Sequence, residues 1–237
     1  MSYYKLLNDD LVHYGFKYVE GLNVDTLEFN PNDSCKPGGL YYTDFEHIGS
    51  WASEGRTKIA QVTLPPDAHV YNEPCKTKWK ADRLVLGPIR PLKDFLAEQT
   101  DDTIIRWLGQ GYGSHILANF APTSPVVCQW MVKKWQDALN YIPVHTAELS
   151  LVAVEAHPAA LNCVKPEFLT QELALVACRG NPALADVYKD EAFRLAVVAE
   201  NPEAINYMSD PSRAVIAAAM AAAPPTAKFE VKILRGC

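Results

Sequence analysis

The sequence predicts an α+β protein, with a small antiparallel-rich domain over residues 1–92 followed by an α-helical repeat domain of the solenoid type over residues 93–223. Three observations support this prediction. Short runs of alternating polarity between Pro and Gly turns fill the first part, as is typical of strands. A short phrase, Asn or Asp followed by an aromatic or apolar residue, recurs through the second part. Between them lies Gly87-Pro88-Ile89-Arg90-Pro91, whose two prolines interrupt both helix and sheet pairing.

The first part contains recognisable turn, strand and helix signals. Pro37-Gly38 has the order of a type II turn and leads into a predicted strand at residues 40–42. Thr43 and Glu46 match a capping box, which predicts a helix ending at Gly55. Residues 58–64 alternate between apolar and polar side chains, so they predict a half-buried strand. Two more short strands are expected at residues 68–71 and 83–86.

The recurring phrase sets the period of the second part. Its Asn or Asp stands at residues 119, 140, 162, 186 and 206, so the steps are 21, 22, 24 and 20. In the three later copies a Pro stands four residues earlier, at Pro158, Pro182 and Pro202, and Pro is favoured at the first position of a helix. Each repeat is therefore predicted as a longer helix followed by a shorter one. The longer helices are expected at residues 126–135, 149–156, 173–178 and 193–199.

Stacked repeats bury a common apolar core and leave an outer surface for a partner. The residues predicted for the core are Leu151, Val152, Leu175, Val176, Leu195 and Val198. The residues predicted as exposed anchors for a protein partner are Trp130, Trp135, Arg179, Arg194 and Tyr207. Trp, Tyr and Arg are chosen because they dominate the energetics of protein interfaces.

The last segment, residues 224–237, is predicted as a tail with a short strand. Pro224-Pro225 ends an Ala-rich helix, and residues 228–234 then alternate between apolar and polar side chains. Such a strand would pair with the N-terminal sheet or with another subunit, which leaves a homo-oligomer open.

Composition favours some classes of protein and disfavours others. The 237 residues carry a net charge of −6, without the basic excess of a nucleic-acid surface. No apolar run reaches the roughly 20 residues of a membrane span. The six cysteines form no Cys-x-x-Cys pair, and no His stands at zinc-ligand spacing, so we expect no metal site and a reducing compartment. These features predict a cytoplasmic protein.

Several runs in the first 90 residues resemble an uncharacterised N-terminal domain found in proteins of giant DNA viruses. They are Tyr14 to Tyr18, Cys35 to Thr43 and Val62 to Ala68, and the Cys-x-Pro-Gly-Gly-Leu-Tyr run is the most specific. In that group the domain often precedes ankyrin-type or other helical repeats. The resemblance implies a viral origin and an intracellular setting, and it carries no biochemical activity.

The first part also has a looser similarity to ADP-ribosyltransferase folds, which implies NAD as a cofactor. Those folds place a His or Arg on the first strand, an aromatic strand-to-helix segment next and a Glu on a later strand. His13 could stand in the first place and Tyr41 or Tyr42 in the second. The third place holds Asp82 instead of Glu, so the resemblance implies loss of catalysis at least as readily as retention.

The sequence thus favours a non-catalytic interaction or structural module of a large DNA virus that binds a host or viral protein and uses no cofactor. Two alternatives stay open, an NAD-binding enzyme in the first domain and a virion component. A pocket joining His13 to Tyr41 or Tyr42, with a carboxylate within reach, would favour the enzyme. A filled core at that place would favour the interaction module.

Overall fold

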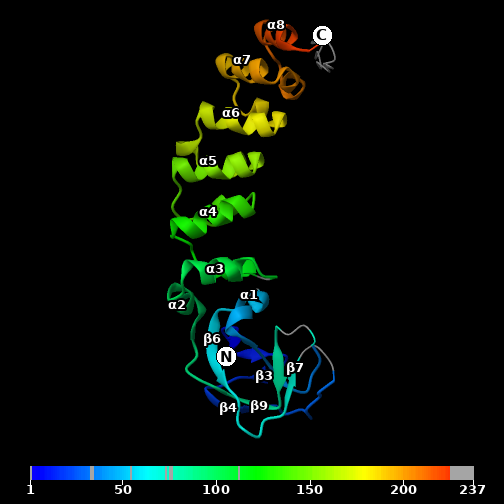
Figure 1. Cartoon of the computed structure of the whole chain (residues 1–237), viewed down its shortest axis with the longest axis vertical. Helices are drawn as coiled ribbons and strands as arrows, with labels where there is room; N and C mark the ends of the chain where they lie inside the picture. Colours follow the sequence, from blue (N-terminus) through cyan, green and yellow to red (C-terminus); the bar gives the residue numbers. More distant parts are fainter. Residues whose placement is uncertain are drawn as a thin grey trace. The chain divides into compact units, whose positions relative to one another are not determined.

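The computed structural model of the chain describes residues 2–32, 35–53, 55–72, 74, 77–111 and 113–224. The chain forms two compact units, Met1–Ala121 and Pro122–Cys237. The first contains a β-sheet with helices and the second contains helices, so the predicted α+β class is confirmed (Figure 1).

The first unit is built on an antiparallel sheet. Among the described residues, eight strands join it in the order β4-β9-β6-β1-β5-β8-β7, and β10 pairs with β6. The strands are β1 (Tyr3–Leu7), β4 (Gly21–Val24), β5 (Leu40–Asp44), β6 (Lys58–Thr63), β7 (Val70–Asn72), β8 (Trp79–Ala81), β9 (Arg83–Leu86) and β10 (Arg90–Pro91). A separate hairpin joins β2 (Val12–His13) to β3 (Phe16–Lys17). The strands predicted at residues 40–42, 58–64 and 83–86 are therefore present.

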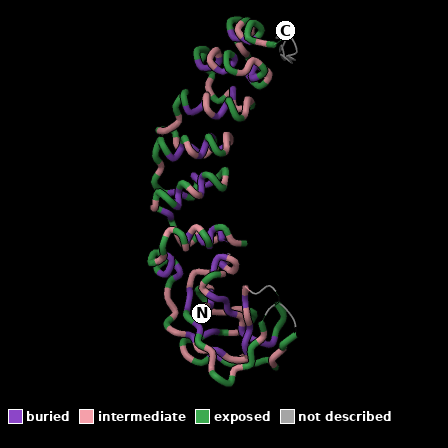
Figure 2. The backbone as a smooth tube through the Cα atoms, in the orientation of Figure 1, coloured by how far each residue is buried: buried purple, intermediate pink, exposed green. Residues whose placement is uncertain are grey.

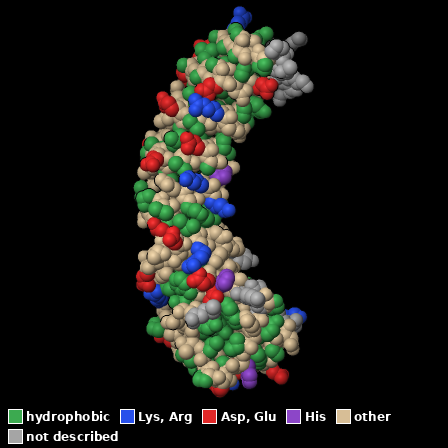
Figure 3. Space-filling model, viewed as in Figure 1, with side chains coloured by type: hydrophobic (Ala, Val, Ile, Leu, Met, Phe, Trp, Pro, Cys, Tyr) green, Lys and Arg blue, Asp and Glu red, His purple; other side chains and the backbone are tan. Residues whose placement is uncertain are grey.

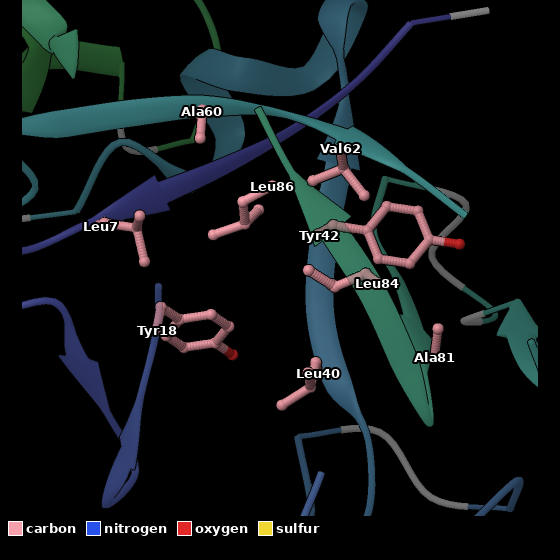
Figure 4. Packing of buried hydrophobic residues seen from close by; sticks show 9 residues of the cluster. All are labelled: Leu7, Tyr18, Leu40, Tyr42, Ala60, Val62, Ala81, Leu84 and Leu86. Carbon is pink, nitrogen blue, oxygen red and sulfur yellow. The ribbon is translucent and has the colours of Figure 1, made fainter. Parts of the chain in front are cut away.

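Apolar side chains of these strands form one core (Figure 4). Successive side chains of a strand point to opposite faces of the sheet, so every second residue of a strand can enter this core. On β9, Leu84 and Leu86 are buried and Val85 between them is half-buried. Ala60 and Val62 of β6 and Leu7 of β1 join the same cluster.

The first unit extends beyond the boundary predicted near residue 92, because three further helical segments pack within it. These are α2 (Leu92–Ala97), α3 (Asp101–Leu108) and η2 (Gly113–Ala118). Trp107 of α3 is fully buried, and its ring Nε1 donates a hydrogen bond of 3.0 Å to the carbonyl oxygen of Phe45. A Cβ atom on Gly49 would lie 2.2 Å from the carbonyl oxygen of Trp107, so this close approach requires glycine. The boundary was predicted from two nearby prolines, and such a local signal could not indicate this packing.

The helix start at the end of β5 also differs from the prediction. Asp44, rather than Thr43, caps η1 (Phe45–His47), because its carboxylate accepts a hydrogen bond from the backbone N–H of His47. Thr43 is still part of β5, where its hydroxyl donates to the carbonyl oxygen of Thr77 at 2.7 Å. The α-helix that follows, α1 (Ile48–Trp51), ends before the predicted Gly55.

The second unit is a stack of α-helices in which every one but the last described helix is followed by short 3₁₀-helical segments (Figure 1). The α-helices are α4 (Pro125–Lys134), α5 (Ala147–Ala156), α6 (Gln171–Gly180), α7 (Glu191–Glu200) and α8 (Arg213–Ala222). The 3₁₀-helices are η3 (Ala138–Tyr141), η4 (Pro158–Cys163), η5 (Pro166–Phe168), η6 (Pro182–Asp186) and η7 (Pro202–Tyr207). The short helices η4, η6 and η7 begin at the prolines that predicted them.

Side-chain caps mark the N-termini of α5, α6, α7 and α8. Thr146, Thr170, Asp190 and Ser212 each accept a hydrogen bond from the backbone N–H three residues later. Counting from the cap, α5, α6 and α7 each bury positions three, four, seven and eight, as the buried stripes of Figure 2 illustrate. Of the six predicted core residues, Val198 is buried. Leu151 is exposed and the other four are half-buried. The prediction thus placed the buried face of these helices on positions that lie beside the buried ones.

The predicted strand at residues 228–234 lies outside the described residues, as does the tail of residues 224–237 apart from Pro224. Within the described part of the chain, no helix has the length and apolar character needed to cross a membrane.

Candidate functional site

The predicted anchors of the repeat unit have different environments. Tyr207 is exposed over 54% of its surface. Arg179 is exposed too, but its guanidinium pairs with Glu200, with Nε 2.7 Å from Oε2. Trp130 and Trp135 are half-buried and pack edge to face with ring centroids 5.4 Å apart. Tyr207 is thus the anchor best placed to meet a partner.

Arg194 was predicted as an exposed anchor, and the structure buries it with 6% of its surface exposed. It occupies the fourth helical position of α7, where α5 has Ser150 and α6 has Ala174. The Asp186 carboxylate lies 2.6 Å away and compensates its charge. Arg194 is therefore a structural residue of the stack, and the prediction that its side chain is exposed is wrong.

An apolar row, exposed at three of its four positions, runs along the repeat unit. It consists of Tyr141, Cys163, Val187 and Tyr207, each at the end of a 3₁₀-helix or directly after it. Tyr141 is 49% exposed, Val187 39% and Tyr207 54%, and Cys163 is half-buried. Their spacing of 22, 24 and 20 residues is that of the repeat, so they hold equivalent positions in successive layers.

The short helices hold this apolar row on a fixed base. In each case the residue two positions earlier is buried, namely Leu139, Leu161, Ala185 and Ile205. A 3₁₀-helix has three residues per turn, so a buried residue and the one two positions later point in different directions. The row is therefore displayed outward by segments whose other side is anchored in the core.

Two of the four polar residues that precede the row residues connect neighbouring repeats. The amide nitrogen Nδ2 of Asn140 donates to Sγ of Cys163 at 3.5 Å, and Oδ1 of Asp186 accepts from the backbone N–H of Ser209 at 3.1 Å. In these two copies the recurring phrase combines a polar link to the next layer with an outward apolar side chain. This signal was present in the sequence, yet only Tyr207 of the row was predicted as a binding residue.

The surface of the repeat unit suits contact with protein. On the face shown in Figure 3, apolar side chains lie along the repeats among interspersed charges of both signs. Exposed Tyr side chains on a rigid support are frequent anchors at protein interfaces. Within the described residues, no group of His, Cys, Asp and Glu side chains is arranged to hold a metal ion.

A second feature is a cavity of about 320 Å³ in the first unit. His13, Tyr41 and Tyr42 all line it, as the enzyme alternative requires. Tyr42 is buried in the sheet core and Tyr41 is half-buried, consistent with their opposite directions on β5. An adjoining hollow of about 280 Å³ shares His13 and Tyr41 and includes Asp25.

The cavity opens where two strands separate. The pairing of β1 with β5 comprises Tyr3 opposite Asp44 and Tyr4 opposite Thr43. At the next residue, Nζ of Lys5 donates to the carbonyl oxygen of Tyr41 at 2.7 Å and lies 3.4 Å from Nδ1 of His13. Lys5 is only 3% exposed. Burial, and then repulsion by Arg56, lowers the pKa of Lys5 to about 7.

The fourth residue of the predicted catalytic set does not join the others. Asp82 is absent from the residues that line the cavity, and it pairs with Arg83 and His69. Partial burial alone would raise the pKa of Asp82, but hydrogen bonds from Arg83 and His69 lower it below its usual value. The structure therefore brings together His13, Tyr41 and Tyr42 without Asp82.

Comparison with known proteins identifies relatives in a giant virus. Protein R868 of Acanthamoeba polyphaga mimivirus, named for ankyrin repeats, is 38% identical over 97 residues, which cover 39% of this chain and 48% of R868. The uncharacterised mimivirus protein R869 is 35% identical over 97 residues, covering 39% of this chain and 69% of R869. The chain belongs to the R869 family. No family model and no solved structure matches it.

Membership of the R869 family confirms the predicted giant-virus resemblance at the level of the family. That the Cys-x-Pro-Gly-Gly-Leu-Tyr run marks its N-terminal domain stays a prediction. The chain spans about half the length of R868 and 26% of R896, another mimivirus protein named for ankyrin repeats. The repeat of this R869-family chain, at 20 to 24 residues, is shorter than the roughly 33 residues of an ankyrin repeat.

Proposed function

We propose that this R869-family protein is a non-catalytic interaction module that binds a viral or host protein through the apolar row Tyr141, Cys163, Val187 and Tyr207. The observation that carries the proposal is the recurrence of these apolar side chains, three exposed and one half-buried, at the same position of successive repeats. The mimivirus relatives named for ankyrin repeats are consistent with it, since helical repeat arrays commonly present extended binding surfaces.

The geometry of a stack favours a helical partner. Packed helices lie about 8–10 Å apart, so successive row residues should be spaced by roughly that distance. Two turns of an α-helix, or seven residues, rise by about 10.5 Å. We therefore expect the partner to present an amphipathic helix with apolar residues seven positions apart.

Capture of partners by the tagged full-length chain from infected host cells tests this function. The informative variant is Tyr141→Ser/Tyr207→Ser, which removes the two aromatic side chains of the row. The matched control is Val126→Ser/Val144→Ser, because both valines are exposed apolar residues outside the row. We expect the double Tyr variant to capture at least about tenfold less partner than wild type does, since a Tyr anchor at an interface often contributes about 2 kcal/mol or more to binding. Equal capture by wild type and the Tyr variant would contradict the proposal, as would equal loss in both variants.

An NAD-binding enzyme is a second candidate, favoured by the cavity that joins His13 to Tyr41 and Tyr42. Asp82 lies outside that cavity, so the candidate lacks the carboxylate assigned to it. A rise in melting temperature on addition of NAD would support this candidate. Residence in the host cytoplasm, a place in the virion, and the absence of nucleic-acid binding stay predictions.

A further inference from the structure

We propose that the cavity between β1, β5 and α1 binds the phosphate group of a small ligand that also carries a planar ring, a mononucleotide in chemical class. This site belongs to the first unit and is independent of the apolar row. The cationic side chains, the aromatic side chains and the volume of the cavity support the proposal.

Three cationic side chains line the cavity, and each donates a hydrogen bond to a group other than a carboxylate. Nζ of Lys5 donates to the Tyr41 carbonyl, Nζ of Lys78 donates to Sγ of Cys35 at 2.7 Å, and Nη1 of Arg56 donates to Oδ1 of Asn8 at 2.9 Å. Lys5 and Lys78 are both buried. None of the described lining residues is acidic. Buried cations are costly without a compensating anion, so this arrangement is expected to attract one.

The doubly charged form of a phosphate matches this set better than a single carboxylate does. Its oxygens can accept charge-assisted hydrogen bonds from several donors at once. The cavity of about 320 Å³ is at the small end of the range of ligand pockets, which fits a mononucleotide better than a larger molecule.

Aromatic side chains complete the site. Tyr14, Tyr41 and Trp51 line the cavity, and Lys78 Nζ lies 4.5 Å from the Trp51 ring centroid and 5.0 Å from that of Tyr41. Tyr14 is held with a φ of 51° in the hairpin turn, a conformation disfavoured for bulky residues, and its ring stacks on His13 with centroids 4.3 Å apart. Such strained residues cluster at functional sites, and exposed rings can stack on a nucleobase.

The protonation states are consistent with anion binding. Burial, then repulsion by Lys5 and Arg56, lowers the pKa of His13 to about 3, so its ring is neutral at pH 7. With its pKa near 7, Lys5 is only partly protonated there. An anion beside Lys5 would favour the charged ammonium.

Calorimetric titration of the full chain with AMP, inorganic phosphate and adenosine, at pH 7 and constant ionic strength, tests the proposal. We expect AMP to bind more tightly than phosphate and adenosine to bind least. Binding of neither AMP nor phosphate would overturn the proposal, and so would adenosine binding as tightly as AMP. Equal affinities for AMP and phosphate would overturn the part that concerns the ring.

Variants separate this site from general charge effects. Lys78→Met and Arg56→Gln are each expected to weaken AMP binding about tenfold or more, because each removes a charge-assisted contact. Lys93→Met is the matched control, because Lys93 is exposed on α2 and does not line the cavity. Lys5→Met should lose AMP binding while the chain stays folded, as circular dichroism would verify. Unchanged AMP affinity in both Lys78→Met and Lys5→Met would overturn the assignment.

Discussion

Arg194 and Asp186 form an ion pair within the repeat unit, with Nη2 2.6 Å from Oδ1. The Arg194 guanidinium also donates to the carbonyl oxygens of Ser209 and Asp210, at 3.0 and 3.2 Å. It therefore connects η6, α7 and the turn that follows η7. Partial burial alone would raise the pKa of Asp186, but hydrogen bonds from Lys189 and Ser209 lower it below its usual value. The carboxylate is accordingly ionised at neutral pH and compensates the buried guanidinium.

Replacing Arg194 should destabilise the chain much more than replacing Arg179. Arg194→Ala removes a buried guanidinium that bonds the Asp186 carboxylate and two carbonyl oxygens, and a hydrogen bond to a charged group contributes about 1.5–3 kcal/mol. The matched control is Arg179→Ala, because Arg179 and Glu200 form an exposed pair worth about 1 kcal/mol or less. Urea unfolding of the two variants and wild type measures the difference. Equal losses in unfolding free energy would contradict the role assigned to Arg194.

Gly49→Ala should disrupt the packing of α1 against α3. The new Cβ atom would lie 2.2 Å from the carbonyl oxygen of Trp107, so backbone must move, at a cost of about 1–3 kcal/mol or more. Gly111→Ala serves as control, because no atom lies within 4 Å of a Cβ atom there. Thermal unfolding followed by tryptophan fluorescence compares the two. A melting temperature of Gly49→Ala as high as that of Gly111→Ala would show that this contact is not as close as described.

Lys5→Met should raise the unfolding free energy and weaken its pH dependence. The folded-state pKa of Lys5 is about 7, against 10.5 in the unfolded chain, so between these values the unfolded state binds more protons. The contribution of Lys5 to stability is then most unfavourable below pH 7 and becomes less so as the pH rises toward 10. Wild type should accordingly gain stability relative to Lys5→Met over that range, by an amount on the order of several kcal/mol. Urea unfolding at pH 7, 8.5 and 9.5 measures it, and a constant difference would contradict the buried state of Lys5.

Much of the local structure could be predicted from the sequence. Prolines at residues 158, 182 and 202 indicated where short helices begin, because a proline at that position restricts the backbone directly. Alternation along residues 58–64 indicated β6 for a similar reason, since period two is a local property. Signals of this kind depend on neighbouring residues alone.

Features set by distant contacts could not be predicted in the same way. Trp107 belongs to the first unit because it packs against Phe45, 62 residues away in the chain. Arg194 is buried because Asp186 and Ser209 surround it in the folded stack. In the sequence, Lys5 resembles the exposed residue of a strand of alternating polarity. It lines the cavity because β5 separates from β1 at this residue. The period at which the residues of the apolar row recur could be recognised in the sequence, but the exposure of their side chains could not be predicted from it.

Site-specific photo-cross-linking in infected cells tests the central claim most directly. A photoreactive phenylalanine analogue would replace Tyr207 in the apolar row, and in a matched chain it would replace Val126, which is exposed outside the row. We predict that the analogue at residue 207 forms a covalent adduct with a discrete partner protein and that the analogue at residue 126 does not. No adduct at residue 207, or the same adduct from both positions, would contradict binding through the row.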